Sequence, residues 1–519
     1  MSTPPRRLLF DALFDRADDP AWGARTAAIT EGQPHTYAEL ADAVRRLATA
    51  LAARGVQRGD RVAIYLDNTW PCLVAILGAL VAGGVFLVIN PLTKTDKLGF
   101  ILDDSGARVL VTDGHIAGEF GPLLPLRPNL HVIASGALPE GLAAEPFDAV
   151  LAASTPSAMP APVIALDLAA LIYTSGSTGQ PKGVMQTHQS MLFAARSLIQ
   201  YLRLGADERI LCTLPLAFDY GLYQWLMAVQ LGATLVLERS FAYPAQVFAR
   251  MTEHAVTVFP GVPTIFAMLL SAHRREPLCF PAVTRVTNTA AALPDAQALH
   301  LREVFPNALI YKMYGLTECK RVCYLEPELL EAKPGSVGKA IPGTEVYLRS
   351  PEGEPVPPGE PGILHVRGPH VMRGYWNRPE LSAHMLQPGA LPGERVLCTH
   401  DWFRMDAEGF LYFVGRSDDI IKSRGEKVSP AEVENVLQAL DGVREAAVVG
   451  VPDELLGQAI RAYVVLEPDA APGVPRIRAW CARHLEGFMV PQEIVPVASL
   501  PRTATGKVSR KALLERPPA

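Results

Sequence analysis

Short apolar segments alternate with longer amphipathic segments through the first four-fifths of the chain. Buried strands are predicted where three to five residues in a row are mainly apolar, as at 61–65, 109–112, 131–133, 234–237 and 256–259. Helices are predicted between them, for example at 37–54 and 244–253, where apolar residues recur at helical spacing. Strands that alternate with helices in this way are typical of an α/β fold built on parallel sheets.

An uncharged apolar run at 72–89 is close to the length that would cross a bilayer. Gly83-Gly84 divides this run into two pieces of different character. The piece before the glycines reads as a buried helix, and 85–89 reads as a buried strand that ends at Asn90-Pro91. Helix, glycine turn and strand together form a unit of a buried parallel sheet, so we predict no membrane span.

The pattern changes twice towards the C-terminus. From about residue 351 short strands separated by Gly/Pro turns predict a small β subdomain. After residue 415 we predict a compact α+β unit, with helices at 430–440 and 474–484 and strands at 445–451 and 460–466. We therefore divide the chain into a large N-terminal domain, 1–417, and a small C-terminal domain, 418–519.

Composition excludes some classes of partner. The 519-residue chain has 48 Lys and Arg against 53 Asp and Glu, a net charge of −5, so no basic excess exists to bind a nucleic-acid backbone. The 7 cysteines are scattered and form no zinc motif. A reduced, cytoplasmic protein with small-molecule partners is expected.

The most informative segment begins at Thr174, where the apolar strand 169–173 continues into backbone rich in Gly, Ser and Thr, with Lys182 at its far end. Glycines let backbone N–H groups approach an anion, hydroxyls donate further hydrogen bonds, and the lysine adds a positive charge. A Walker A loop is excluded, because Pro181 precedes the lysine and Gly183 follows it. A flexible linker is the alternative, but linkers rarely adjoin a buried strand.

Four further segments carry candidate chemistry. They are Tyr314-Gly315-Leu316-Thr317-Glu318 after a strand at 308–311, Thr399-His400-Asp401 at the end of another strand, the charged stretch 415–428, and 501–508 with Lys507. Taken alone, Glu318 reads as a surface acid, Asp401 as a turn residue and Lys507 as part of a basic tail. Their order along the chain is what gives them meaning.

Together these segments resemble the adenylate-forming superfamily, which comprises acyl-CoA synthetases, adenylation domains of nonribosomal peptide synthetases and beetle luciferases. The resemblance covers nearly the whole chain. It implies that ATP and Mg²⁺ are used to adenylate a carboxylate, which then passes to a pantetheine thiol. It also implies that 1–417 is the adenylation core and that 418–519 swings on a hinge at Asp418.

The resemblance implies a role for each matching residue. Lys182 and the loop before it would hold the ATP phosphates, the loop residues being Thr174, Ser175, Gly176, Ser177, Thr178 and Gly179. Thr317 would contact phosphate and Glu318 would ligate Mg²⁺, while Tyr314 and Gly315 would lie at the adenine, and Asp401 and Arg416 would hold the ribose. Lys507 would reach the substrate carboxylate. His400 departs from the family, which more often has glycine before the ribose aspartate.

The acid pocket is implied in the same way. Asp219, after Phe218, aligns with the aspartate that pairs with the α-ammonium group in members that activate amino acids; the alternative is that Asp219 caps a helix beginning at Tyr220. The other pocket residues would be Tyr220, Tyr223, Pro260, Val286, Asn288, Met313, Arg321 and Val322. Arg321 does not suit proline, and could meet an acidic group of the substrate or face a carrier protein.

These residues favour a small, proline-like amino acid that is loaded onto the phosphopantetheine of a carrier protein. The alternative is an acyl-CoA synthetase that uses free CoA. Two functions of other classes are further alternatives. One is a luciferase-like oxygenase, which shares the fold. The other is a catalytically inactive binding protein, which would be expected to lack Lys507 or Glu318, but both are present.

Overall fold

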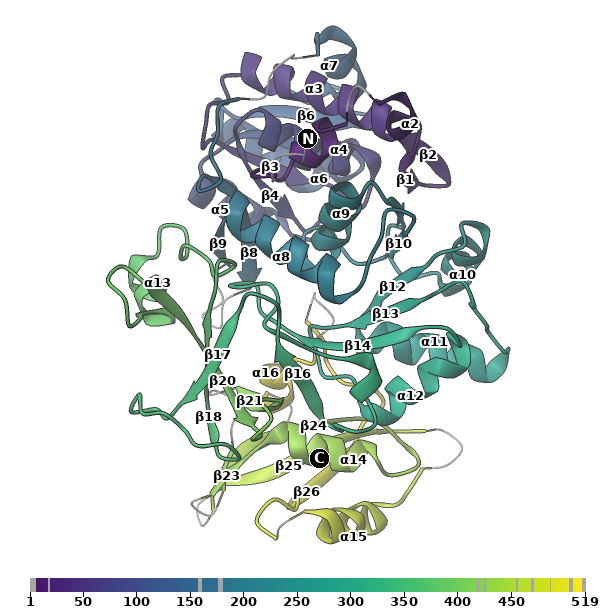
Figure 1. Cartoon of the computed structure of the whole chain (residues 1–519), viewed down its shortest axis with the longest axis vertical. Coiled ribbons are helices and arrows are strands. Elements are labelled where there is room, and N and C mark those ends of the chain that lie inside the picture. Colours follow the sequence, from purple (N-terminus) through teal and green to yellow (C-terminus); the bar gives the residue numbers. More distant parts are fainter. Residues whose placement is uncertain are drawn as a thin grey trace.

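The computed structural model describes residues 6–16, 19–156, 161–175, 181–416, 419, 421–423, 426–453, 456–467, 471–485, 487–503 and 507–515. In Figure 1 the first third of the chain lies at the top, the middle third on the right and the β subdomain on the left, with the C-terminal elements at the bottom.

A first sheet of seven strands has the order β7-β6-β5-β3-β4-β8-β9. The strands are β3 Arg61–Tyr65, β4 Val85–Ile89, β5 Ala107–Asp113, β6 His131–Ser135, β7 Glu145–Pro146, β8 Leu168–Ser175 and β9 Pro181–Thr187. Neighbouring strands are parallel except for β9, which runs antiparallel to β8. Every residue of β4 is buried, as its continuous apolar run predicts.

The apolar run at 72–89 is the buried helix α4 (Trp70–Val81) followed by β4. A side chain at Gly84 would press on the Ala79 carbonyl, 3.1 Å from an ideal Cβ, so the turn between helix and strand needs glycine. No helix in the described part of the chain is long and apolar enough to cross a membrane. The helix and the strand predicted for this segment are confirmed.

Helices cover the sheets. The helix predicted at 37–54 is α3 (Tyr37–Ala53), whose first turn is closed by a capping box between Thr36 and Glu39. The helices that follow are α5 Thr95–Ser105, α6 Ala117–Phe120, α7 Phe147–Ala153, α8 His188–Tyr201, α9 Asp219–Leu231, α10 Pro244–Glu253, α11 Pro263–Arg275, α12 Asp295–Val304 and α13 Pro379–Met385.

A second, mixed sheet joins the middle of the chain to the β subdomain. Its core strands are β1 Thr26–Thr30, β2 Gln33–Thr36, β10 Arg209–Cys212, β11 Thr234–Leu237, β12 Val258–Gly261, β13 Arg285–Asn288 and β14 Leu309–Tyr314. It continues through β15 Cys323–Leu325, β16 Ser336–Ala340, β17 Glu345–Arg349, β18 Pro361–Arg367, β19 Leu386–Pro388, β20 Arg395–Met405 and β21 Leu411–Arg416. The β subdomain thus begins at Glu345, a few residues before the predicted change of pattern.

One predicted position is wrong. Asp401 lies within the long strand β20 rather than at the end of a strand. The strand continues because Trp402 and Phe403 pair with Gly415 and Phe413 of β21, with a register shift between these two pairs. His400 lies in a separate irregularity of the β18–β20 pairing, between Cys398 and Trp402, and has a positive φ of 56°. This conformation favours the glycine that the family more often has there.

The C-terminal elements form a sheet of their own. It contains β22 Ile421–Ser423, β23 Glu426–Val428, β24 Val443–Asp453, β25 Gly457–Leu466 and β26 Glu493–Pro496, with helices α14 Pro430–Gln438, α15 Val474–His484 and α16 Arg510–Leu514. Val433, Leu437, Ile460 and Ile477 belong to a separate apolar core. The α/β fold with a smaller α+β C-terminal domain is confirmed. The boundary at 417/418 stays a prediction, because both residues lie outside the described ones.

Candidate active site

The predicted phosphate-binding segment is the connection between two antiparallel strands. Thr174 near the end of β8 is paired in register with Lys182 near the start of β9. The Thr174 hydroxyl is buried and has no hydrogen-bond partner within the described residues. The candidate residues Gly176, Ser177, Thr178 and Gly179 lie outside the described residues, as does the side chain of Ser175. Lys182 thus lies on a strand that the sequence reading did not predict.

A second group of candidates meets where β14, β20 and β21 lie close together. The Tyr314 hydroxyl at the end of β14 donates a hydrogen bond to Asp401 Oδ2. Arg416 is the cross-strand partner of Asp401, with its Nε 3.7 Å from Asp401 Oδ1. Burial raises the pKa of Asp401, and the positive charge of Arg416 opposes that shift. The structure therefore brings together three of the four residues predicted at the adenosine.

The turn after β14 carries Gly315, Thr317 and Glu318. An ideal Cβ on Gly315 would come within 2.1 Å of the Lys320 carbonyl, so the turn closes this tightly only because residue 315 is glycine. The Thr317 carbonyl accepts a hydrogen bond from Lys320 Nζ at 3.0 Å. Glu318 is only 8% exposed, so it is not the surface acid that it resembles in isolation.

Glu318 and Lys182 meet at a residue that sequence analysis missed. The Tyr375 hydroxyl lies 2.5 Å from Glu318 Oε1 and 2.9 Å from Lys182 Nζ, and Lys182 is itself 3.6 Å from Glu318. Nothing in the sequence pattern points to Tyr375 except an aromatic pair with Trp376 beside a glycine. Its partners lie 57 and 193 residues away along the chain.

Lys507 of the C-terminal domain joins the same site. Burial lowers its pKa, and so does the positive charge of Arg416, whereas the carboxylates of Asp219, Asp401 and Glu318 act in the opposite direction. Those three carboxylates belong to the N-terminal domain, so the structure holds the C-terminal domain against the candidate site. Asp418, the predicted hinge, lies outside the described residues.

Asp219 has a partner within the chain. Its Oδ2 lies 3.6 Å from Arg321 Nη1, and the two side chains are 6% and 3% exposed. The guanidinium of Arg321 also lies over the Tyr220 ring, 4.9 Å from the centroid, and the Tyr220 hydroxyl donates to the Thr287 carbonyl at 2.7 Å. Asp219, Arg321 and Tyr220 therefore form one buried cluster.

Two readings of this cluster are wrong. Asp219 does not cap a helix, because it is the first residue of α9 and the N-cap position, Phe218, has no side-chain cap bond. Arg321 does not face a carrier protein on the surface, because it is buried. The remaining predicted pocket residues are also buried, namely Tyr223, Pro260, Val286, Asn288, Met313 and Val322.

Lys320 is a second residue that sequence reasoning missed. It is fully buried, its φ is 68°, and burial lowers its pKa to about 8, although Asp219 and Glu318 act in the opposite direction. Two adjacent cations, Lys320 and Arg321, thus lie beside Asp219 and Glu318. The sequence signal was the pair Lys-Arg directly after Cys319.

The donors present suit a hard cation that is bound together with a nucleotide. No group of three or more His, Cys, Asp or Glu side chains that could hold a metal lies in the described part of the chain. Mg²⁺ is commonly held by one or two carboxylates together with substrate phosphates. Glu318, buried beside Lys182 of the β8–β9 hairpin, fits that manner of binding.

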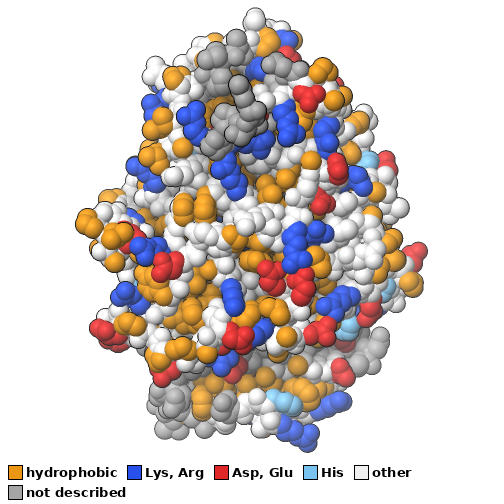
Figure 2. Space-filling model, in the orientation of Figure 1, with side chains coloured by type: hydrophobic (Ala, Val, Ile, Leu, Met, Phe, Trp, Pro, Cys, Tyr) orange, Lys and Arg blue, Asp and Glu red, His pale blue; other side chains and the backbone are white. Residues whose placement is uncertain are grey.

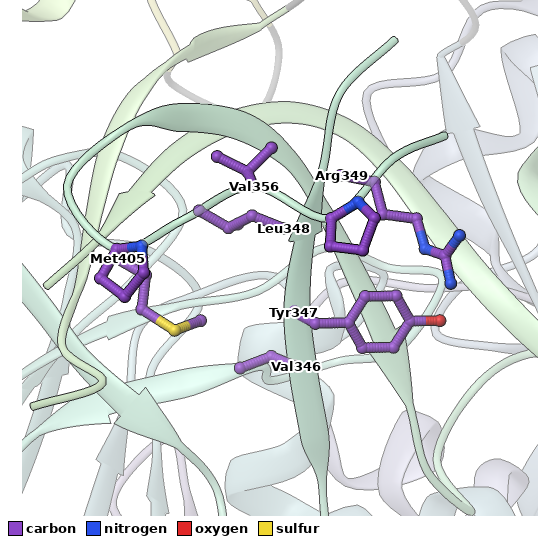
Figure 3. Close-up of a pocket in the computed structure, with 8 residues that line it drawn as sticks. Val346, Tyr347, Leu348, Arg349, Val356 and Met405 are labelled. Atoms are coloured by element: carbon purple, nitrogen blue, oxygen red, sulfur yellow. The ribbon is translucent and has the colours of Figure 1, made fainter. Parts of the chain in front are cut away.

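A pocket of about 310 Å³ lies elsewhere, in the β subdomain. Val346, Tyr347, Leu348, Arg349, Val356 and Met405 line it (Figure 3). None of the candidate site residues contributes to it. On the face of the molecule in Figure 2, basic side chains predominate towards the top, and acidic and basic side chains lie side by side lower down.

Comparison with known proteins gives the family. The family model described as AMP-binding enzyme matches residues 15–376, and the model described as AMP-binding enzyme C-terminal domain matches 432–507. A feruloyl-CoA synthase from Amycolatopsis sp is 35% identical over 95% of this chain and 96% of that protein. Tyrocidine synthase 3 from Brevibacillus parabrevis is 32% identical over 97% of this chain but only 8% of that protein.

Solved structures agree with this assignment. The structure of a benzoate CoA ligase from Burkholderia xenovorans LB400 has a TM-score of 0.87 and 31% identity, over 98% of this chain and all of that chain. The matched segments contain Lys182, Glu318, Tyr375 and Lys507. The chain belongs to the AMP-binding enzyme family, within the adenylate-forming superfamily, and is an AMP-forming acid–thiol ligase.

Proposed function

We propose that the chain is an AMP-forming acyl-CoA ligase, which joins a carboxylic acid without an α-ammonium group to free CoA. The observation that carries the proposal is the buried ion pair of Asp219 and Arg321. In a ligase for amino acids Asp219 would pair with the ammonium group of the substrate, but here a cation of the chain already neutralises it. The names of the feruloyl-CoA synthase and the benzoate CoA ligase support CoA as the thiol.

The proposed reaction has two steps. First a carboxylate oxygen attacks the α-phosphorus of ATP, and pyrophosphate leaves. Then the thiolate of CoA attacks the acyl carbon, and AMP leaves with the electron pair of the broken C–O bond. Both steps build negative charge on oxygen, which preorganised cations stabilise.

The residues of the site fit these steps. Lys182 would hold the phosphates, and Lys507 would hold the acid carboxylate beside the α-phosphorus. Asp401 and Arg416 would bind the ribose hydroxyls, and Tyr314 would pack against adenine. Mg²⁺, held by Glu318 together with phosphate oxygens, would supply further positive charge when bound.

A panel of acids tests the proposal. We expect ATP–pyrophosphate exchange with aromatic or aliphatic carboxylates and none with proline or other amino acids. CoA should then release AMP and give an acyl-CoA of the expected mass. Exchange with an amino acid alone, and no thioester on CoA, would contradict the proposal.

Transfer of a proline-like amino acid to a carrier protein is the second candidate. The relationship to tyrocidine synthase 3 favours it, but the occupied Asp219 does not. The same panel separates the two, because only this candidate predicts exchange with proline and thioester formation on a phosphopantetheinylated carrier protein. A cytoplasmic location also stays a prediction.

A further inference from the structure

The segment around Tyr375 joins the two halves of the phosphate site. The Met372 amide donates to the Glu318 carbonyl at 2.8 Å, and the Trp376 amide donates to the Gly183 carbonyl at 2.8 Å. Glu318 follows β14 in the second sheet, whereas Gly183 lies on β9 in the first. This short segment therefore sets the distance between the hairpin and the carboxylate.

Tyr375 is held rigidly within this segment. Its ring is 1% exposed, and its amide donates to Ser382 Oγ at 2.8 Å. Lys182 Nζ lies 4.3 Å from the ring centroid, so the ring face also contacts the ammonium group. The residue is therefore held at its backbone, at its ring face and at its hydroxyl.

That hydroxyl makes two charge-assisted hydrogen bonds. It donates to Glu318 Oε1 and accepts from Lys182 Nζ. Burial raises the pKa of Tyr375, and the negative charge of Glu318 raises it further, so the phenol keeps its proton and remains a donor. Such bonds are stronger than those between neutral groups.

We propose that Tyr375 is a positioning residue that keeps Glu318 and Lys182 apart and aimed at the metal and phosphate sites. The two opposite charges are only 3.6 Å apart. They already form an ion pair at that distance, and without the hydroxyl between them they would close into direct hydrogen-bond contact, which would occupy the carboxylate and the ammonium that MgATP needs. The inference rests on the proposed function only for the roles of Glu318 and Lys182.

The test is Tyr375→Phe, which removes the hydroxyl and keeps the ring beneath Lys182. Because hydrogen bonds to charged groups are lost, the dissociation constant of MgATP, measured by calorimetry, should rise roughly tenfold or more. The Mg²⁺ concentration that half-saturates ATP–pyrophosphate exchange should rise in parallel. The KM for the acid should stay within about twofold, because the acid pocket is untouched.

Tyr347→Phe is the matched control, since Tyr347 lies in the β-subdomain pocket and outside the site. Should Tyr375→Phe not fold, Ser382→Ala loosens the same residue without removing its hydroxyl, and should weaken MgATP binding in the same direction. Wild-type affinity for MgATP in a folded Tyr375→Phe or Ser382→Ala protein would overturn the inference. Absence of exchange in the wild-type protein would instead contradict the proposed function.

Discussion

At the scale of single residues, the ion pair of Asp219 and Arg321 is both a structural and a functional feature. Both side chains are almost fully buried. Removing one member leaves the other charge in a medium of low dielectric constant. The cost of such an unpaired charge exceeds the net gain from the pair itself.

Arg321→Met should therefore lower the free energy of unfolding by about 3–5 kcal/mol. The double variant Asp219→Asn/Arg321→Met should recover much of that loss, because no charge is then left unpaired. Urea denaturation of the three proteins checks both statements. An equal loss in the single and double variants would show that Arg321 acts by packing on Tyr220 rather than by charge.

Lys320 gives a prediction about pH. Its pKa is about 8 in the folded protein, whereas an unfolded lysine titrates near 10.4. Between these values the unfolded chain binds more protons, so the destabilisation due to Lys320 is fully present below about pH 8 and disappears as the pH rises past 10.4. Lys320→Met removes the group from both states. The free energy of unfolding of this variant, minus that of the wild type, should therefore fall by roughly 3 kcal/mol between about pH 7 and 10.5.

Denaturation of both proteins at a series of pH values measures the difference between their free energies of unfolding. The titration of all other groups cancels in this difference. Lys97→Met on the exposed surface of α5 is the control and should show a flat difference. A flat difference for Lys320→Met as well would mean that the lysine is solvated in the folded protein.

At the scale of elements, the tight turn between α4 and β4 of the first sheet depends on its glycines. Gly84→Ala would place a Cβ 3.1 Å from the Ala79 carbonyl, 3.2 Å from the Asp60 carbonyl and 3.3 Å from the Val62 side chain. Overpacking of this kind typically costs about 1–3 kcal/mol. Gly118→Ala in α6 meets nothing within 4 Å and should be neutral or slightly stabilising.

Thermal unfolding of the two variants checks this pair. A lower midpoint for Gly84→Ala and an unchanged or higher one for Gly118→Ala is expected. Equal midpoints would show that the turn can move away from α4 at little cost.

Helices and strands whose ends are marked in the sequence were predictable from it. The pairing of a strand with its neighbours in the sheet was not. The strand at 85–89 and the helices at 244–253 and 474–484 have the predicted bounds, because glycine, proline or a change of periodicity marks their ends. The strand β9 was missed because Pro181 and Gly183 disfavour a strand locally, and only pairing with β8 forms it.

The site shows the same division. Lys182, Glu318, Asp401 and Lys507 could be predicted as site residues because their neighbours form motifs. Tyr375, Lys320 and the role of Arg321 were missed, since each depends on burial and on contacts between distant parts of the chain.

At the scale of the whole molecule, the site is assembled from two domains. Lys507 reaches it only because the C-terminal domain lies against the N-terminal one. Lys507→Ala should lower the rate of adenylation by about 100-fold or more, because a cation beside the developing charge is lost. Thioester formation from supplied acyl-adenylate should be spared.

Lys511→Ala on α16 is the matched control in the same domain. Pyrophosphate exchange and the release of AMP from supplied acyl-adenylate measure the two half-reactions separately. Equal loss of both in Lys507→Ala would mean that Lys507 does not act in adenylation alone.

The sheet order carries one more consequence. β14, which leads to Glu318, and β20 and β21, which carry Asp401 and Arg416, belong to one hydrogen-bonded sheet. The strands that would hold the adenosine part of the nucleotide thus belong to one sheet, whereas Lys507 belongs to the C-terminal domain, whose strands form a separate sheet at the bottom of Figure 1. Binding of ATP and adenylation of the acid therefore depend on different domains. An N-terminal domain without the C-terminal one would still carry the residues that would bind ATP, and would bind ATP without transferring its AMP to an acid.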